Sequence, residues 1–362
     1  MQLRIFAIAL LLPVSNLLAQ NPRQLARPEE FPHDFTIVRS VGALPDGRVV
    51  VTDLKENKVQ LLNWPTGKLV DLGRLGAGPR EYRAVGGVYH DKGGGLVVYD
   101  PQQQRYLPID PKGEVGDVRG VAGSSGGFLL MLDDGPDQFV ADTVGGVFTT
   151  APAPGQDSFP LMRNIAGKET VVTRLKSPER RTVGDQSSGM TASRVVSFSP
   201  RDFWSPSPDG WVAVVRNLPY RVDWYPPTGA VVRGPSIPFT PLPVTEADKK
   251  VIRDKANAAP AQQMTINGQT RSLPRLEPQF AAMKPPTTGR AVRDERGRIW
   301  VERSRAAEIA TSTWDIFDRT GAVVDRVEFP AGVRLIAVDG SWAYGTRTDS
   351  DELQHLLRFR LQ

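Results

Sequence analysis

The chain has 362 residues, of which 40% are hydrophobic and 23% charged, and its formal net charge is +5. This composition is typical of a globular protein with a large core. Because the charges are interspersed along the chain, no nucleic-acid partner is expected. The absence of cysteine excludes disulfides and a lipid-modified cysteine, so the stability of the protein must come from its core. We also expect a monomer.

The N-terminal stretch "MQLRIFAIALLLPVSNLLAQ" has the pattern of a secretory signal peptide. Arg4 precedes an apolar run, Ile5 to Leu12, which Pro13 interrupts. The run is too short to span a bilayer, and no later segment approaches that length, so no membrane span is expected. We predict a signal peptide over residues 1–19 and an exported, periplasmic or extracellular product; the alternative is a buried N-terminal helix.

A glycine turn followed by an apolar strand recurs along the chain, as in "PDGRVVVTD" and "PDGWVAVV". The turn glycines are Gly47, Gly94, Gly126, Gly210, Gly297 and Gly340. A second turn, as in "PPTGAVV", recurs further on, at Gly67, Gly113, Gly229 and Gly321. Since Asp-Gly between apolar runs is a strong hairpin signal, each period contains two hairpins and thus four strands.

Four strands in a period of about 40 to 50 residues correspond to one propeller blade. The sequence therefore predicts an all-β, six-bladed β-propeller of four-stranded antiparallel blades over residues 35–362, after a linker at 20–34. Seven blades are the alternative, because "AGKETVVTR" around Gly167 lies about midway between Gly126 and Gly210. An elongated third blade is preferred, since Ala151 to Asn164 lacks the glycine of a second hairpin.

The segments "DLKENKVQLL" and "GRLGAGPREYRAVGGVYHDKGGGLVVYD" resemble the NHL-like six-bladed propellers. Asp53, Asn57, Lys58 and Val59 match that family's segment between strands, and Gly76, Gly78, Pro79, Glu81 and Tyr82 match its corner. The resemblance covers about Ile37 to Leu361 and implies a fold, not an activity. Because another strand follows Gly73 to Tyr82, we interpret this stretch as a corner between blades and not as a phosphate loop, which requires a helix.

An insertion at residues 241–286 separates the predicted fourth and fifth blades. It begins with "TEADKKVIRDKANAA", where Thr245 as N-cap and Asp248 three residues on predict a helix. The later part, "APAQQMTINGQTRSLPRL", is predicted as loop. We expect the insertion to project from one face, and the early strand Phe35 to Val38 to join the last blade and close the ring.

No catalytic set is evident, and none is predicted. His33, His90 and His355 are the only histidines; they are not expected to converge, and without cysteine the common zinc sets lack ligands. No cofactor is predicted, although calcium stays open because its oxygen ligands leave no compact motif. The densest acidic cluster, Asp133, Asp134 and Asp137, does not fit an EF-hand loop and is better interpreted as a solvated turn.

The stretch "DFWSPSPDGWVAVVRNLPYRVDWY" is the richest in aromatic residues. We name Trp204, Tyr220, Arg221 and Trp224 as candidate ligand-binding residues, because exposed aromatics beside arginine can stack on a glycan or hold a peptide; packing between blades is the alternative. The sequence thus favours a non-enzymatic binding or scaffold propeller with an unknown protein or glycan partner. The alternative function is a metal-dependent hydrolase or lactonase of the calcium type.

Overall fold

The computed structural model describes residues 21–91, 93–120, 140–143, 146–150, 156–165, 167–185, 190–207, 209–259, 263–266, 269–272 and 277–361. The predicted signal peptide, the turn glycine Gly126 and the acidic cluster at Asp133, Asp134 and Asp137 lie outside these ranges. No helix among the described residues is both long enough and apolar enough to cross a bilayer.

The first half of the described chain forms three four-stranded antiparallel sheets. The first contains β3 (Val38–Ala43), β4 (Val49–Asp53), β5 (Lys58–Asn63) and β6 (Lys68–Asp71). The second contains β9 (Val88–His90), β10 (Leu96–Asp100), β11 (Arg105–Ile109) and β12 (Arg119–Gly120). The third contains β13 (Val140–Thr143), β14 (Gly146–Thr150), β15 (Ser158–Ile165) and β16 (Lys168–Lys176).

The second half repeats the pattern. The fourth sheet contains β19 (Phe203–Pro206), β20 (Val212–Asn217), β21 (Tyr220–Tyr225) and β22 (Val232–Arg233). The fifth contains β28 (Thr287–Arg293), β29 (Ile299–Arg303), β30 (Ser312–Phe317) and β31 (Val323–Phe329). The sixth contains β32 (Val333–Asp339), β33 (Trp342–Thr348) and β34 (Gln354–Arg360) from this half.

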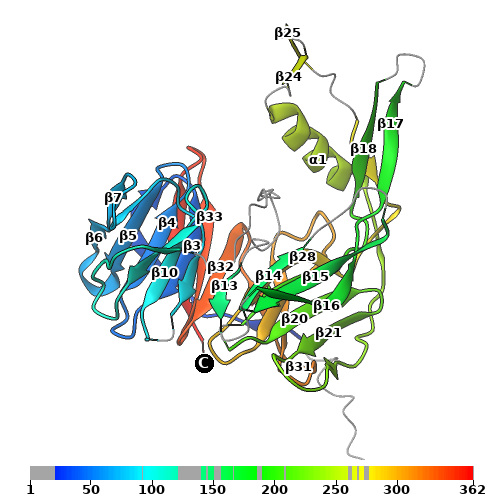
Figure 1. The fold of residues 1–362 in the computed structure, drawn as a ribbon. Helices are drawn as coiled ribbons and strands as arrows, with labels where there is room; N and C mark the ends of the chain where they lie inside the picture. Colours follow the sequence, from blue (N-terminus) through cyan, green and yellow to red (C-terminus); the bar gives the residue numbers. More distant parts are fainter. Residues whose placement is uncertain are drawn as a thin grey trace, which may run out of the picture.

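These sheets are arranged radially, with the first strand of each at the centre. The first strands of successive sheets lie side by side, β9 next to β3, β3 next to β32, β32 next to β28, and β28 next to β19. Five buried apolar clusters among the described residues fill spaces between neighbouring sheets, as in the cluster of Trp224, Ile299 and Phe317 between the fourth and fifth. The fold is therefore a β-propeller, as the sequence predicts (Figure 1).

The recurring glycines that the structure describes occupy the predicted turns. Gly47 and Gly210 both have φ of 84°, a conformation that costs other residues energy and that hairpin turns require. Gly167, with φ of 83°, lies in the turn between β15 and β16 of the third sheet. This sheet has the long outer strands that the preferred interpretation expected, and Gly167 starts no separate sheet.

The N-terminal segment contributes edge strands to the last two sheets. β2 (Glu29–Phe35) pairs antiparallel with β34, and β1 (Arg23–Gln24) pairs parallel with β31. A strand before the first sheet does join the last one, but it is Glu29–Phe35 instead of Phe35 to Val38. Pairing thus begins inside the segment predicted as a linker, because Phe31 and Phe35 bury their rings against Trp64 and Leu356.

The corner at Gly73 to Tyr82 connects the first and second sheets. Its short strands β7 (Arg74–Leu75) and β8 (Glu81–Tyr82) pair in parallel, and the strand β9 follows. The Glu81 carboxylate accepts the Gly78 N–H at 2.7 Å and pairs with Arg74 at 2.6 Å. The corner interpretation is confirmed, and the carboxylate fills the position that an anion would need.

Two long connections project from the propeller on one side (Figure 1). One is the hairpin of β17 (Arg180–Asp185) and β18 (Met190–Ser197), which connects β16 to β19. The other contains β23 (Leu242–Pro243), the helix α1 (Glu246–Ala258), the hairpin of β24 (Gln263–Ile266) and β25 (Gln269–Ser272), β26 (Gln279–Phe280) and β27 (Met283–Lys284). The parallel pairing of β18 with β26 joins the two.

Helix α1 confirms the predicted N-terminus. Thr245 is the N-cap, and its hydroxyl and the Asp248 carboxylate form a capping box. The prediction of a loop after the helix is wrong in part, because β24 and β25 form a hairpin there. The residues between these strands read Asn-Gly in the sequence, which is a hairpin signal that outweighs the polar composition.

Candidate functional site

Three ionisable side chains from three different sheets meet at the axis of the propeller. His90 ends β9 of the second sheet, Asp339 ends β32 of the sixth, and Glu295 lies in the turn that follows β28 of the fifth. One ligand atom of each residue lies within 4.8 Å of the others. Among the residues that the structure describes, this is the one group of at least three such side chains with that spacing.

The first strands of the sheets position this axial cluster, which we define as His90, Glu295 and Asp339. Each residue lies at or just past the end of a first strand, where the chain turns back outward. The two projecting connections enter at the opposite ends of first strands, before β19 and β28. The axial cluster therefore lies on the face of the propeller opposite the projections.

Hydrogen bonds orient the three side chains. His90 Nε2 lies 2.8 Å from Asp339 Oδ2 and 3.6 Å from Glu295 Oε1. Backbone N–H groups hold both carboxylates: Ala43 N donates to Asp339 Oδ2 at 2.5 Å, and Gly340 N donates to Glu295 Oε2 at 3.1 Å. The side chains of Asp339, His90 and Glu295 are 5%, 32% and 49% exposed, so solvent reaches the cluster from the Glu295 side.

The proximity of the three groups shifts their protonation. Burial opposes ionisation of Asp339, but the hydrogen bond and charge of His90 outweigh it and lower the pKa of Asp339. Burial and the neighbouring Asp339 raise the pKa of Glu295. Burial likewise disfavours the charged imidazole, yet the Asp339 carboxylate raises the pKa of His90 overall. Two carboxylates this close together need a proton or another positive charge between them.

A partly buried arginine lies beside the axial cluster. Arg293 ends β28, and its guanidinium donates to the carbonyl of Pro206 in the fourth sheet. Burial lowers the pKa of Arg293 to about 10, while the nearby Asp209 and Tyr89 favour its charged form. Its charge also favours the neutral imidazole of His90. At this end of the axis, side chains from the second, fourth, fifth and sixth sheets thus interact.

This arrangement supports two kinds of chemistry. His90 and Asp339 form the histidine–carboxylate pair that serves as a general base in many enzymes. One imidazole nitrogen and two carboxylate oxygens are also ligands that divalent cations accept. The sequence analysis missed this set because its members lie far apart in the chain. A signal existed: each member lies one to four residues before a turn glycine, namely Gly94, Gly297 or Gly340.

The four residues named from the aromatic stretch lie in the fourth sheet. The side chains of Trp204, Tyr220 and Trp224 are 5%, 3% and 0% exposed and pack against the third and fifth sheets. The indole N–H of Trp224 donates to the carbonyl of Asp318, and Arg221 pairs with Asp223 at 2.8 Å. In this conformation the rings serve inter-blade packing, and ligand binding by them stays a prediction.

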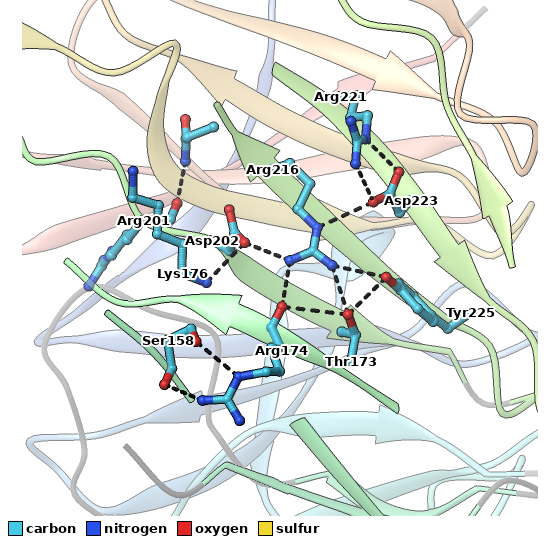
Figure 2. Close-up of polar contacts among 11 residues, drawn as sticks. Ser158, Thr173, Arg174, Lys176, Arg201, Asp202, Arg216, Arg221, Asp223 and Tyr225 are labelled. Atoms are coloured by element: carbon cyan, nitrogen blue, oxygen red, sulfur yellow. Dashed lines mark hydrogen bonds and ion pairs between the residues drawn. The ribbon is translucent and has the colours of Figure 1, made fainter. Parts of the chain in front are cut away.

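A second polar cluster surrounds Arg216 at the end of β20 (Figure 2). Its guanidinium donates to Asp202 at 2.6 Å, to Asp223 at 3.2 Å and to the Tyr225 hydroxyl at 2.9 Å. Further donations to Thr173 and to the carbonyl of Arg174 bind it to β16. Because all three nitrogens already have acceptors, this cluster is a joint between the third and fourth sheets.

Comparison with known proteins leaves the activity open. No protein-family model and no curated protein matches the chain. Similar solved structures include a calcium-binding protein, regucalcin, from Agrobacterium tumefaciens (12% identity, 94% of this chain, 96% of that chain, TM-score 0.41). Others are a gluconolactonase from Xanthomonas campestris (11%, 95%, 96%, 0.39) and virginiamycin B lyase from Staphylococcus aureus (12%, 93%, 99%, 0.38). Similarity at this level says nothing about the activity of this chain. The β-propeller assignment rests on the arrangement of its own sheets.

Proposed function

We propose that this chain is an exported, monomeric, NHL-like propeller of six blades that binds a protein partner on the face bearing the two projections. The observation that carries the proposal is the pairing of β18 with β26. It joins two connections from different parts of the chain into one projection, which has no role in closing the propeller. In such folds the sheets usually form a rigid scaffold, and the connections between them usually carry the binding residues.

The projection is anchored in a fixed orientation. Lys284 of β27 is 5% exposed, and its ammonium contacts Asp248 of α1 at 2.6 Å and the carbonyl of Arg305 at 2.6 Å. A buried pair with a further acceptor holds the helix against the loop that follows β29. Such preorganisation reduces the entropy that a partner must overcome on binding.

The outer strand of the projection suits an extended polypeptide. In the three-stranded group β17 lies at the edge, in the order β17, β18, β26. Edge strands recruit partners by adding a strand through backbone hydrogen bonds. Its side chains include Arg180 and Arg181, both at the exposed surface, which favours an acidic partner segment. A protein partner is therefore preferred to a glycan.

Site-specific photo-crosslinking tests this proposal. A photoreactive phenylalanine at Arg181 should yield a discrete protein adduct in the native envelope. The same residue at Val70, 46% exposed on the outer strand of the first sheet, is the matched control and should yield none. Equal adducts at both positions, or none at Arg181 together with binding on a glycan array, would contradict it.

A metal-dependent hydrolase or lactonase is the second candidate, and the axial cluster is the observation that favours it. Calcium is the cation that the sequence analysis left open for such an enzyme. A panel of lactones and esters, assayed with calcium and with chelator, tests this candidate. Turnover that chelator abolishes and that Glu295→Gln removes would support it; no turnover on any substrate would contradict it.

A further inference from the structure

We infer that His90, Glu295 and Asp339 bind one divalent cation of the type that accepts nitrogen and oxygen ligands, such as Zn²⁺ or Mn²⁺. This inference deepens the second proposed function, because it names the class of ion that the axial cluster would hold. It requires no reaction, so an absence of turnover on lactones and esters would leave it standing. The ion would connect the second, fifth and sixth sheets at the centre of the propeller. No hairpin links these three sheets to one another.

The distances between the ligand atoms are close to those that such an ion needs. Ligands about 2.1 Å from a tetrahedral ion are about 3.4 Å from one another. His90 Nε2 and Glu295 Oε1 are 3.6 Å apart, which already suits this geometry. His90 Nε2 and Asp339 Oδ2 are 2.8 Å apart, so that pair must open by roughly half an ångström, within the reach of a small side-chain rotation.

The carboxylates are held as ligands usually are. Each accepts a backbone N–H, from Ala43 in the first sheet and Gly340 in the sixth. Outer hydrogen bonds of this kind fix ligand orientation and contribute to affinity. Because Gly340 occupies Oε2 of Glu295, the other oxygen, Oε1, remains directed at His90. Three protein ligands leave the remaining coordination positions to solvent.

The charges balance with a cation present. Two carboxylates carry a charge of −2 when both are ionised, and Asp339 is buried, where unpaired charge is costly. A divalent ion satisfies both and accepts the imidazole nitrogen of His90 as a third ligand. The guanidinium of Arg293 is itself directed away, toward the carbonyl of Pro206, and its charge is shared with Asp209.

The donor set argues against calcium. Calcium takes six to eight oxygen ligands, whereas this cluster offers one nitrogen and two carboxylates. Imidazole with carboxylate suits zinc, manganese and similar ions. His355, by contrast, faces Glu30 and Asp34 with Nδ1 and Asp349 with Nε2. No three ligand atoms of this second group lie within 4.8 Å of one another, whereas those of the axial cluster do.

Calorimetric titration of chelator-treated full-length protein with Zn²⁺, Mn²⁺ and Ca²⁺ tests the inference. We expect one equivalent of Zn²⁺ or Mn²⁺ to bind more tightly than Ca²⁺ and to raise the Tm. Glu295→Gln should weaken this binding by about 10- to 100-fold or more. The matched control is Glu30→Gln, which alters a comparably exposed glutamate beside the other clustered histidine and should leave the affinity unchanged.

Histidine NMR of the wild-type protein provides a readout that does not depend on the folding of a variant. The ring signals of His90 should shift on addition of one equivalent of Zn²⁺, while those of His33 and His355 stay in place. The inference would be overturned if no ion bound stoichiometrically or if the protein bound Ca²⁺ most tightly. It would also be overturned if Glu295→Gln and Glu30→Gln lost the same affinity, or if the signals of His355 shifted instead of those of His90.

Discussion

Asp53 and Asp100 stand six residues after the turn glycines Gly47 and Gly94, and they make the same set of hydrogen bonds. Each carboxylate accepts two N–H groups from the turn that follows it and two from the segment entering its sheet. For Asp53 these donors are Thr36, Ile37, Lys55 and Glu56; for Asp100 they are Arg83, Ala84, Gln102 and Gln103. The repeated aspartate thus ties each sheet to the chain that enters it.

Replacing Asp53 by alanine should lower the free energy of unfolding by about 2–4 kcal/mol, because an interior N–H left without a partner costs about 1–3 kcal/mol. Asp53 is 2% exposed, so water cannot substitute fully for its carboxylate. Urea unfolding followed by tryptophan fluorescence measures the loss. Asp117→Ala is the control, since its side chain is 71% exposed in a surface pair and should cost less than about 1 kcal/mol. Equal losses in the two variants would contradict this role.

Arginine takes the place of this aspartate in the fourth and fifth sheets. Arg216 and Arg303 stand six residues after Gly210 and Gly297. Each contacts an aspartate on the next strand, Asp223 at 3.2 Å and Asp315 at 2.8 Å. In these two sheets a charge pair thus stands where the first two sheets have a carboxylate that binds backbone N–H groups.

Replacing Asp223 by alanine should destabilise the protein by about 1.5–3 kcal/mol, the usual contribution of a hydrogen bond to a charged group. The change removes the buried carboxylate that Arg216 and Arg221 share, while Arg216 keeps Asp202 at 2.6 Å. The side chains of Asp223 and Arg216 are 2% and 14% exposed. Calorimetric unfolding gives the change in stability. Glu179→Ala removes the partner of Arg181 at the surface, where both side chains are about half exposed, and should cost less than about 1 kcal/mol. A loss for Asp223→Ala within that range would show that the joint in Figure 2 is not required.

The sequence predicts the sheets because the signals that form them are local. A glycine in a tight turn and an apolar run after it act within about ten residues, and both are visible in "PDGRVVVTD". The strand Glu29–Phe35 was assigned to a linker because its alternation is obscured by Pro32 and four charged or histidine side chains. Its pairing depends on β34, which lies more than 300 residues away. A pattern within the strand itself cannot predict such a distant partner.

The axial cluster shows the same limit for function. His90, Glu295 and Asp339 are separated by long stretches of chain, and each alone resembles an ordinary turn residue. Only the radial order of the sheets brings the ends of β9, β28 and β32 together. The aromatic stretch shows a different limit, since residue type alone does not distinguish a surface ring from Trp224, which is fully buried.

Removing the N-terminal strand should lower the Tm, because β2 completes the last sheet and covers its edge. Phe31 and Phe35 are 1% and 2% exposed, and deleting a buried phenylalanine ring alone costs about 3–5 kcal/mol. A chain starting at Arg39 is compared with one starting at Asn21 by differential scanning calorimetry. The point variant Phe31→Ala, which keeps the backbone pairing, separates ring burial from strand loss. Closure by β2 is wrong if the two chains melt at the same temperature.

The same closure should depend on pH through His355, which pairs with Asp34 across β2 and β34. The hydrogen bond that His355 donates to Asp349, together with the charges of Glu30 and Asp34, raises the pKa of His355 above its ordinary value. A raised pKa in the folded state means that the protonated form binds its partners. The stabilisation is therefore complete below about pH 6.5, which is the pKa of histidine in an unfolded chain. It is lost as the pH rises through the higher pKa that His355 has in the folded protein. The Tm of the wild type relative to His355→Gln should accordingly fall as the pH rises above about 6.5. Because His90 is unchanged in both proteins, its own titration cancels in the difference. Parallel curves for the two proteins would mean that these carboxylates do not stabilise the charged ring.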